Sequence, residues 1–336
     1  MINDQPPIPP LRQLCDERCA GGLAVTACYT TKWDVIQDDV IKFLDGAFTY
    51  YSSLYIKALN RFDPEANSAF SLNYLNDIDG AFMLLMSCCV EGDAEEPEKI
   101  ELIPTELDRA FSLLQLQSAY DSNSFQEILY KISSEIRGVG KGEVRPVFDK
   151  YIKEEISKHR MTEADVPFKY IFFKNAGIGL NTRFKRYFFA RVEEFLAKGM
   201  NLNMKHTLSD FVSKTGVKTG FHIEHILAHN AENLGKFDGD EDKFEQERNR
   251  LGAILLLKGK DNISSNNEVY AEKLKSYANT LYWNETLRED SYKSKLDMKK
   301  LKSDYNLELE PLNSFGVKDI EARQALLFKI ASIVWI

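Results

Sequence analysis

The chain has 336 residues, of which 44% are hydrophobic, 12% aromatic and 28% charged, and its formal net charge is -8. No run approaches the roughly 20 apolar residues of a membrane-spanning helix, which excludes an integral membrane protein. The N-terminus has no basic-then-apolar signal sequence, and the five cysteines are odd in number and lack CxxC spacing. We therefore expect a cytoplasmic globular protein with neither a disulfide framework nor a zinc ribbon.

The charge is distributed unevenly along the chain. Residues 1–139 contain 10 Lys and Arg against 22 Asp and Glu, whereas residues 140–336 contain 33 against 29. An acidic front half and a mildly basic back half predict that any contact with a polyanion lies in the back half.

The front of the chain predicts an arm followed by helices. Residues 1–30 are proline-rich and then irregular, and we expect an N-terminal arm there. Residues 31–100 predict an acidic helical domain with helices over 34–60 and 69–89. The acidic stretch 91–101 has too little apolar content for a core and predicts a solvated linker.

Residues 101–215 predict a second helical domain. Its helix starts are marked by the capping residues Thr105, Asp121, Thr162 and Asn181. The helix from Asn181 has one aromatic face, and its opposite face carries Arg183 and Arg186. Those arginines predict a solvated helix face, with contact to phosphates as the alternative.

The pattern changes after Gly216. Residues 219–226 alternate loosely and 253–258 form a short apolar run, which predicts two strands separated by a polar loop. Residues 266–277 predict a helix. Strand, long loop, strand and helix is the order of a ββα module.

Three of the five histidines, His222, His225 and His229, lie within eight residues and have Glu224 beside them. A carboxylate is a hard oxygen ligand for Mg²⁺ or Mn²⁺, and an imidazole can take a proton from an attacking water. A structural zinc site is disfavoured, because no nearby cysteine completes a set of four and HxxH on a strand points to opposite faces. A histidine cluster without a role is the other alternative.

Further motifs follow at set distances from this cluster. They are Glu224-His225-Ile226, then Asn249 with Gly252 to Leu257, then Asn262, Asn267, Tyr270, Lys273 and Tyr277, and last Arg323 and Trp335. With these motifs roughly the last 120 residues resemble the C-terminal HNH (His-Me finger) nuclease domain of GmrSD-type restriction endonucleases. Several motifs in order are far more specific than any single one.

The resemblance implies a role for each matching residue. His225 would be the general base that activates water, and Glu224 and Asn262 would hold one divalent metal ion, Mg²⁺ or Mn²⁺. Asn249 would lie in the loop that crosses the strands, where a turn-capping role is the alternative. Lys273 would face a phosphate, with a solvated side chain as its alternative.

The resemblance also implies a fold and a function. We expect a mainly α-helical protein with a small ββα-metal (HNH) nuclease module and C-terminal helix in residues 216–336. The expected function is metal-dependent endonuclease cleavage of DNA in a restriction or phage-defence system that acts on foreign or modified DNA. The acidic-Gly-Gln-Gln-Arg motif of the family's N-terminal domain is missing, because Asp45-Gly46 and Asp79-Gly80 are both followed by Ala-Phe. The resemblance then implies that the sensing half is a separate NTP-dependent subunit, was cut away, or was replaced by the acidic helical region. DNA is the expected partner, a homo-oligomer is left open, and no membrane contact is expected.

Two departures from the family pattern keep alternatives open. The family's Pro after Glu-His-Ile is Ala228 here, and its Asn after Gly is Ala253. That Asn is thought to brace the loop that carries the histidine. A catalytically silent subunit that binds nucleic acid or docks a partner is therefore the alternative function. An RNase or toxin with the same site is not separated from a DNase by sequence.

Overall fold

The computed structural model describes residues 37–63, 68–259, 268–293 and 296–336. The chain divides into two compact units, an N-terminal unit that ends at Lys57 and a main unit that begins at Ala58. The described residues 37–57 are all helical and include a π-helical turn, η1 (Leu44–Phe48), and most of α3 (Thr49–Leu59). No helix of the described residues is long and apolar enough to cross a membrane.

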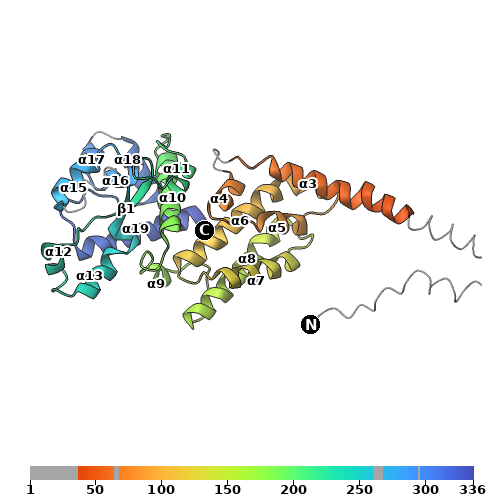
Figure 1. Cartoon of the computed structure of the whole chain (residues 1–336), viewed down its shortest axis with the longest axis horizontal. Coiled ribbons are helices and arrows are strands. Elements are labelled where there is room, and N and C mark those ends of the chain that lie inside the picture. The colour runs from red at the N-terminus through yellow and green to blue at the C-terminus, as the bar shows by residue number, and fades with distance from the viewer. Residues whose placement is uncertain (1–36, 64–67, 260–267, 294–295) are drawn as a thin grey trace, which may run out of the picture. The chain divides into compact units, whose positions relative to one another are not determined.

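The first part of the main unit is a group of helices around α6. These helices are α4 (Ala69–Leu75), α5 (Ala81–Cys88), α6 (Glu96–Leu116), α7 (Ser122–Glu135) and α8 (Lys141–Arg160). Figure 1 shows α6 running through the group, where it packs against α4, α5 and α8. The predicted cap Asp121 is confirmed, because its carboxylate accepts hydrogen bonds from the backbone N–H groups of Asn123 and Ser124 at the start of α7.

The second part of the main unit is built around α10 and holds the two strands of the described residues. Its elements are α9 (Tyr170–Phe173), α10 (Thr182–Gly199), α11 (Leu208–Ser213), β1 (Phe221–His225), α12 (Ala231–Gly235), α13 (Glu241–Arg248), η2 (Leu251–Ala253), β2 (Ile254–Lys258), α15 (Tyr270–Ser276), α16 (Tyr282–Glu285), α17 (Asp290–Lys293), α18 (Leu296–Tyr305) and α19 (Val317–Trp335). Asn181 caps α10 by accepting a hydrogen bond from the N–H of Phe184 at 2.8 Å, as predicted. Helix α10 contacts both strands as well as α11, α16 and α19. The expectation of a mainly helical fold is confirmed.

The two predicted strands pair with each other in antiparallel orientation. The register places Phe221 opposite Lys258 and His225 opposite Ile254. Because side chains alternate along a strand, Phe221 and His225 share one face of the pair, and Glu224 points to the other face. The side chains of Glu224 and His225, which are adjacent in sequence, therefore lie on opposite faces of the sheet.

A close backbone approach joins η2 to α19. A Cβ atom on Gly252 would lie 2.4 Å from the carbonyl oxygen of Ile320, so only glycine fits there. The N–H of Gly252 donates to Oε1 of Gln324 at 2.8 Å, and Arg323 donates to the carbonyl oxygen of Gly252 at 3.2 Å. The amide nitrogen of Gln324 also donates to the carbonyl oxygens of Phe173 and Ala176. One buried amide thus ties α9, the turn after it and η2 to α19.

Several sequence expectations for the helical region are wrong. The acidic stretch is not a linker, because α6 begins at Glu96 and buries Lys99 and Ile100. The helix predicted at Thr162 is replaced by turns and the short α9. Arg186 is 8% exposed rather than solvated. The helix α6 also spans the predicted domain boundary at residue 100, because tertiary burial of its apolar face outweighs the charge of its first turn.

We predict that Gly252→Ala destabilises the main unit by about 2 kcal/mol or more, because a methyl group would collide with backbone that cannot rotate away. Urea unfolding should show a lower midpoint with an unchanged m-value. Gly179→Ala is the matched control, since a Cβ there meets nothing within 4 Å. Equal stability of both variants would contradict the close approach of η2 to α19.

A buried carboxylate on α10 caps the short helix α16. Glu193 is 1% exposed and accepts hydrogen bonds from the backbone N–H groups of Tyr282, at 2.7 Å, and Trp283, at 3.0 Å. Burial raises the pKa of Glu193 to about 7, although both N–H donors and Lys205 act against that rise. Protonation of the folded state therefore persists at a pH where the unfolded chain has already ionised this carboxyl.

This difference predicts that Glu193 makes stability fall as the pH rises from about 5 to 7, by on the order of 1 kcal/mol per pH unit. Below the unfolded pKa both states are protonated, so the contribution of Glu193 to the slope vanishes there. Glu193→Gln cannot ionise, and its unfolding free energy should lack this part of the slope. Urea unfolding of both proteins across this range measures the difference, and identical slopes would contradict it.

Candidate functional site

The end of β1 presents the two central residues of the predicted site to opposite faces. On one face, Nε2 of His225 lies 3.1 Å from Oδ1 of Asn249, which ends α13. Asn249 is held in turn, because its amide nitrogen donates to the carbonyl oxygen of Glu245 at 2.7 Å. These contacts bring together two of the three predicted catalytic residues.

The orientation of Asn249 determines the tautomer of His225. Because the amide nitrogen of Asn249 faces Glu245, its oxygen must face the imidazole, and that oxygen can only accept a hydrogen bond. Nε2 of His225 therefore carries the proton. The other ring nitrogen, Nδ1, is left with a lone pair that can take a proton from water.

The charge around His225 keeps its ring neutral. The pKa of His225 is lowered to about 4, first by burial and next by the positive charge of Arg248. The hydrogen bond to Asn249 acts in the opposite direction, while Lys185 lowers the pKa and Glu245 raises it. Two cations therefore act on a neutral imidazole, an arrangement suited to an anionic group next to a proton acceptor.

Glu245 is the acidic residue of this face. Its carboxylate is paired with Arg248 at 3.0 Å and lies 3.4 Å from Nε2 of His229. The side chain of His229 is 53% exposed. The sequence reasoning missed Glu245 and Arg248, because it predicted a polar loop where the structure has the helix α13. On a helix, a spacing of three residues between Glu and Arg is the usual signal for an ion pair.

The opposite face of β1 is occupied by a buried ion pair. Glu224 is 2% exposed and Lys273 is 1% exposed, and Oε1 of Glu224 lies 2.6 Å from Nζ of Lys273. The ammonium also donates to the carbonyl oxygen of His225 at 2.7 Å. Lys273 thus fastens α15 to the end of β1. A lysine in this position does not reach a phosphate in solvent, which corrects the expected role of Lys273.

The described residues do not supply a ready set of metal ligands. Among them, no group of three or more His, Cys, Asp or Glu is placed to hold a metal ion. The carboxylate of Glu224 already faces an ammonium, so it does not fit the expected role of metal ligand. The predicted partner Asn262, like Asn267, lies outside the described residues. The metal prediction for Glu224 and Asn262 stays a prediction.

His222 and Ala253 are two further positions that the sequence analysis singled out. Nε2 of His222 is buried and has no hydrogen-bond partner among the described residues, and His222 points away from His225. The carbonyl oxygen of Ala253 accepts a hydrogen bond from the N–H of Ile226 at 3.0 Å, directly after His225. Main-chain bonding and Gln324 therefore brace the loop that the missing asparagine was expected to brace.

Comparison with known proteins identifies the region that carries this site. Residues 174–330 match the family described as GmrSD restriction endonucleases, C-terminal domain. The chain matches no curated protein and no solved structure. The matched segment begins before α10 and so includes the helix that packs against both strands. Residues 174–330 are therefore similar to the C-terminal domain of GmrSD restriction endonucleases.

Proposed function

We propose that the chain is an HNH-type DNA endonuclease that hydrolyses phosphodiester bonds with His225 as the general base. The observation that carries the proposal is the contact between His225 and Asn249, which fixes a neutral imidazole with Nδ1 free to accept a proton. The family match supports DNA as the substrate. The order β1, loop, β2 and α15 supports the HNH type.

In the proposed reaction, Nδ1 of His225 takes a proton from the water whose oxygen bonds to phosphorus. The P–O bond to the sugar oxygen of the leaving strand breaks, and that oxygen takes a proton from solvent. The imidazolium that forms keeps its second proton on Nε2, where Asn249 holds the ring in orientation. Arg248 and Lys185 provide positive charge that favours the developing charge of the phosphate. A bound phosphate would also offset these two cations and make His225 a stronger base than it is in the free protein.

Dependence on Mg²⁺ or Mn²⁺ is a separate part of the proposal. A divalent ion would neutralise charge on the phosphate oxygens. The described geometry does not fit Glu224 as its ligand, because Lys273 already pairs with that carboxylate, and we therefore derive no step through a metal ion. Titration with EDTA, Mg²⁺ and Mn²⁺ in the cleavage assay tests this part independently of His225.

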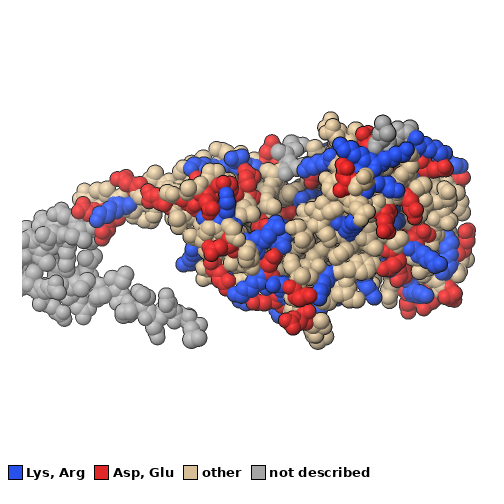
Figure 2. Space-filling model, turned by 180° about the vertical axis from the view of Figure 1, so that it is seen from behind, with Lys and Arg blue, Asp and Glu red and all other residues tan. Residues whose placement is uncertain are grey.

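The charge pattern supports an approach of DNA to the part of the main unit that holds the site. Figure 2 shows basic side chains gathered along the edge where α17 and α18 lie. Lys293, Lys299 and Lys300 on these helices are exposed. Clustered surface lysines attract the phosphate backbone regardless of sequence. Action on modified DNA, a role in phage defence and a separate sensor subunit belong to the same proposal.

We predict that His225→Ala lowers the rate of plasmid cleavage by about 10²- to 10⁴-fold, since a general base contributes that much. Asn249→Ala should lower the rate less, because the ring is then present without its orienting contact. His159→Ala is the control, because His159 pairs with Glu155 on α8 and has no part in the site. Plasmid DNA, modified phage DNA and RNA should each be tested as substrates.

Undiminished cleavage by His225→Ala would sink the proposed mechanism. Absence of cleavage of every substrate by the native chain would favour the silent subunit instead. The bracing of the site by Gln324 and by the main chain of Ala253 argues against that alternative.

The buried pair on the other face of β1 generates a stability prediction. Lys273→Met should destabilise the main unit by about 3–5 kcal/mol, because it leaves the Glu224 carboxylate buried without its cation. Adding Glu224→Leu to that variant should restore much of the loss. Urea unfolding of both single variants and the double variant measures the coupling. Additive effects of the two substitutions would contradict a direct ion pair.

A further inference from the structure

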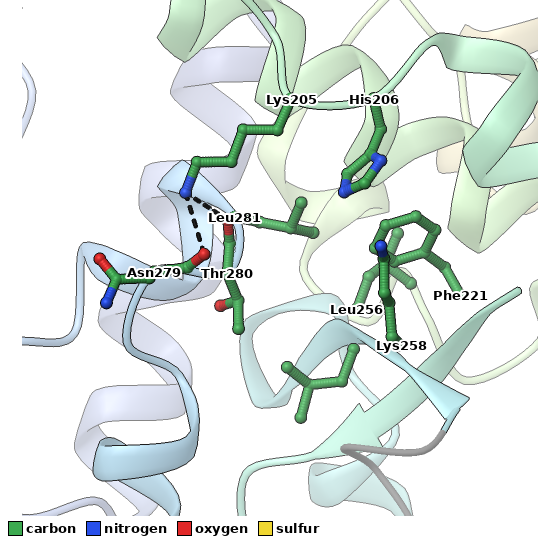
Figure 3. Close-up of a pocket in the computed structure, with 9 residues that line it drawn as sticks. Lys205, His206, Phe221, Leu256, Lys258, Asn279, Thr280 and Leu281 are labelled. Carbon is green, nitrogen blue, oxygen red and sulfur yellow. Dashed lines mark hydrogen bonds between the residues drawn. The ribbon is translucent and has the colours of Figure 1, made fainter. Parts of the chain in front are cut away.

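A cavity of about 240 Å³ lies at the opposite end of the strand pair from His225. Figure 3 shows Lys205 on one side of this cavity and His206, Phe221 and Lys258 on the other. Leu256, Leu257 and Leu281 also line it. The volume is below the roughly 300–1,000 Å³ of pockets that hold drug-sized ligands, which restricts it to one small group.

The cavity is positively charged at its polar end. The side-chain ammonium of Lys258 has no hydrogen bond or ion pair with any described residue, and no Asp or Glu of the described chain lines the cavity. Lys205 is anchored, because its ammonium donates to the carbonyl oxygens of Asn279, at 3.1 Å, and Thr280, at 2.8 Å. Glu285 lies 3.6 Å from Lys205, outside the lining. Among the residues that the structure describes, Lys258 is therefore the cation of the cavity whose ammonium has no polar partner.

The lining also suits a flat, partly apolar group. The leucines are at most 4% exposed, and Phe221 holds the ring of His206 edge-on with the two centroids 5.0 Å apart. The side chain of His206 is 25% exposed. Burial lowers the pKa of His206, and the charges of Lys258, Lys205 and Lys214 lower it further against Asp210, so its ring is neutral at neutral pH. A neutral aromatic ring and leucines beside a lysine are what a nucleotide requires, since bases stack on rings and phosphates pair with cations.

The strand register connects this cavity to the proposed site. Phe221 and His225 are four residues apart on the same face of β1, which is about 13 Å along a strand. A single strand laid along this face from His225 therefore reaches the cavity within about four nucleotides, or fewer where it is more extended than the roughly 3.4 Å per nucleotide of B-form DNA. We propose that this cavity binds one nucleotide of the DNA strand, a phosphate ester with a planar base, with its phosphate on Lys258. This inference rests on the proposed function only for the identity of the strand as DNA.

The test is binding of a labelled, short oligothymidylate to the full chain in EDTA, so that binding is separated from cleavage. Lys258→Gln should weaken binding about tenfold or more, as expected for the loss of a charged contact. It should also lower the slope of log affinity against log salt concentration by about 1. Lys258→Arg should retain affinity within a few-fold. Lys158→Gln on α8 is the matched control for net charge and should bind like the native chain.

Two sources of nucleotide are distinguished by competition. Thymidine monophosphate should displace the oligothymidylate, whereas thymidine and inorganic phosphate should do so only weakly, because each offers half of the ligand. If Lys258→Gln binds the oligothymidylate with the affinity of the native chain, the inference is overturned. Binding of the free monophosphate without binding of the strand would overturn it too, in favour of a free nucleotide.

The same measurements separate this inference from the proposed function. A native chain that binds the strand through Lys258 and cuts no DNA would disprove the nuclease and leave the cavity assigned. If the native chain cuts DNA and Lys258→Gln binds the oligothymidylate as tightly as the native chain does, the nuclease is supported and the inference about the cavity is disproved.

Discussion

The site depends on the close approach of η2 to α19. Gly252 permits backbone to lie against backbone, and the buried amide of Gln324 closes the gap by bonding both η2 and the turn after α9. A second glycine supports the loop from its other side, because a Cβ on Gly177 would lie 2.5 Å from the carbonyl oxygen of Asn249. The segment that carries Asn249 is thus clamped between two backbones. The orientation of His225 follows from that clamp, because Asn249 is the residue that holds its ring.

Because side chains alternate along β1, the sequence neighbours Glu224 and His225 lie on opposite faces and have different roles. Glu224 points to the interior and meets Lys273, and this pair connects β1 to a helix that lies 49 residues further along the chain. His225 points to the other face, where it contacts Asn249 and lies near the positive charges of Arg248 and Lys185. A buried ion pair of this kind contributes more to a unique arrangement of elements than to net stability. Its value to the site is that the same ammonium bonds the carbonyl oxygen of His225 and so fixes the strand end.

The sequence predicted the elements whose signals are local. The caps at Asp121 and Asn181 and the two strands were expected from neighbouring residues. The closing helix was expected from the family resemblance. Prediction from sequence failed where packing against segments far away in the chain determines the local structure. Thr105 predicted a helix start, but it lies inside α6, which runs from Glu96 to Leu116 because its apolar face is covered by other helices. The partner of Lys273 was equally hidden, since helix periodicity shows which face is buried but not which charge lies opposite. No local pattern marks Gln324 as the residue that ties three segments.

The dependence of the loop on α19 has a consequence for the order of events during synthesis. The ribosome completes β2 well before it has made α19, and the interval is about 4–15 s at ordinary rates of elongation. Until α19 emerges, nothing holds Gly252 from that side, and the asparagine that orients the histidine lies on a loop with only half of its clamp. A nascent chain in which α19 has not yet emerged therefore has the chemical groups of the site without their arrangement.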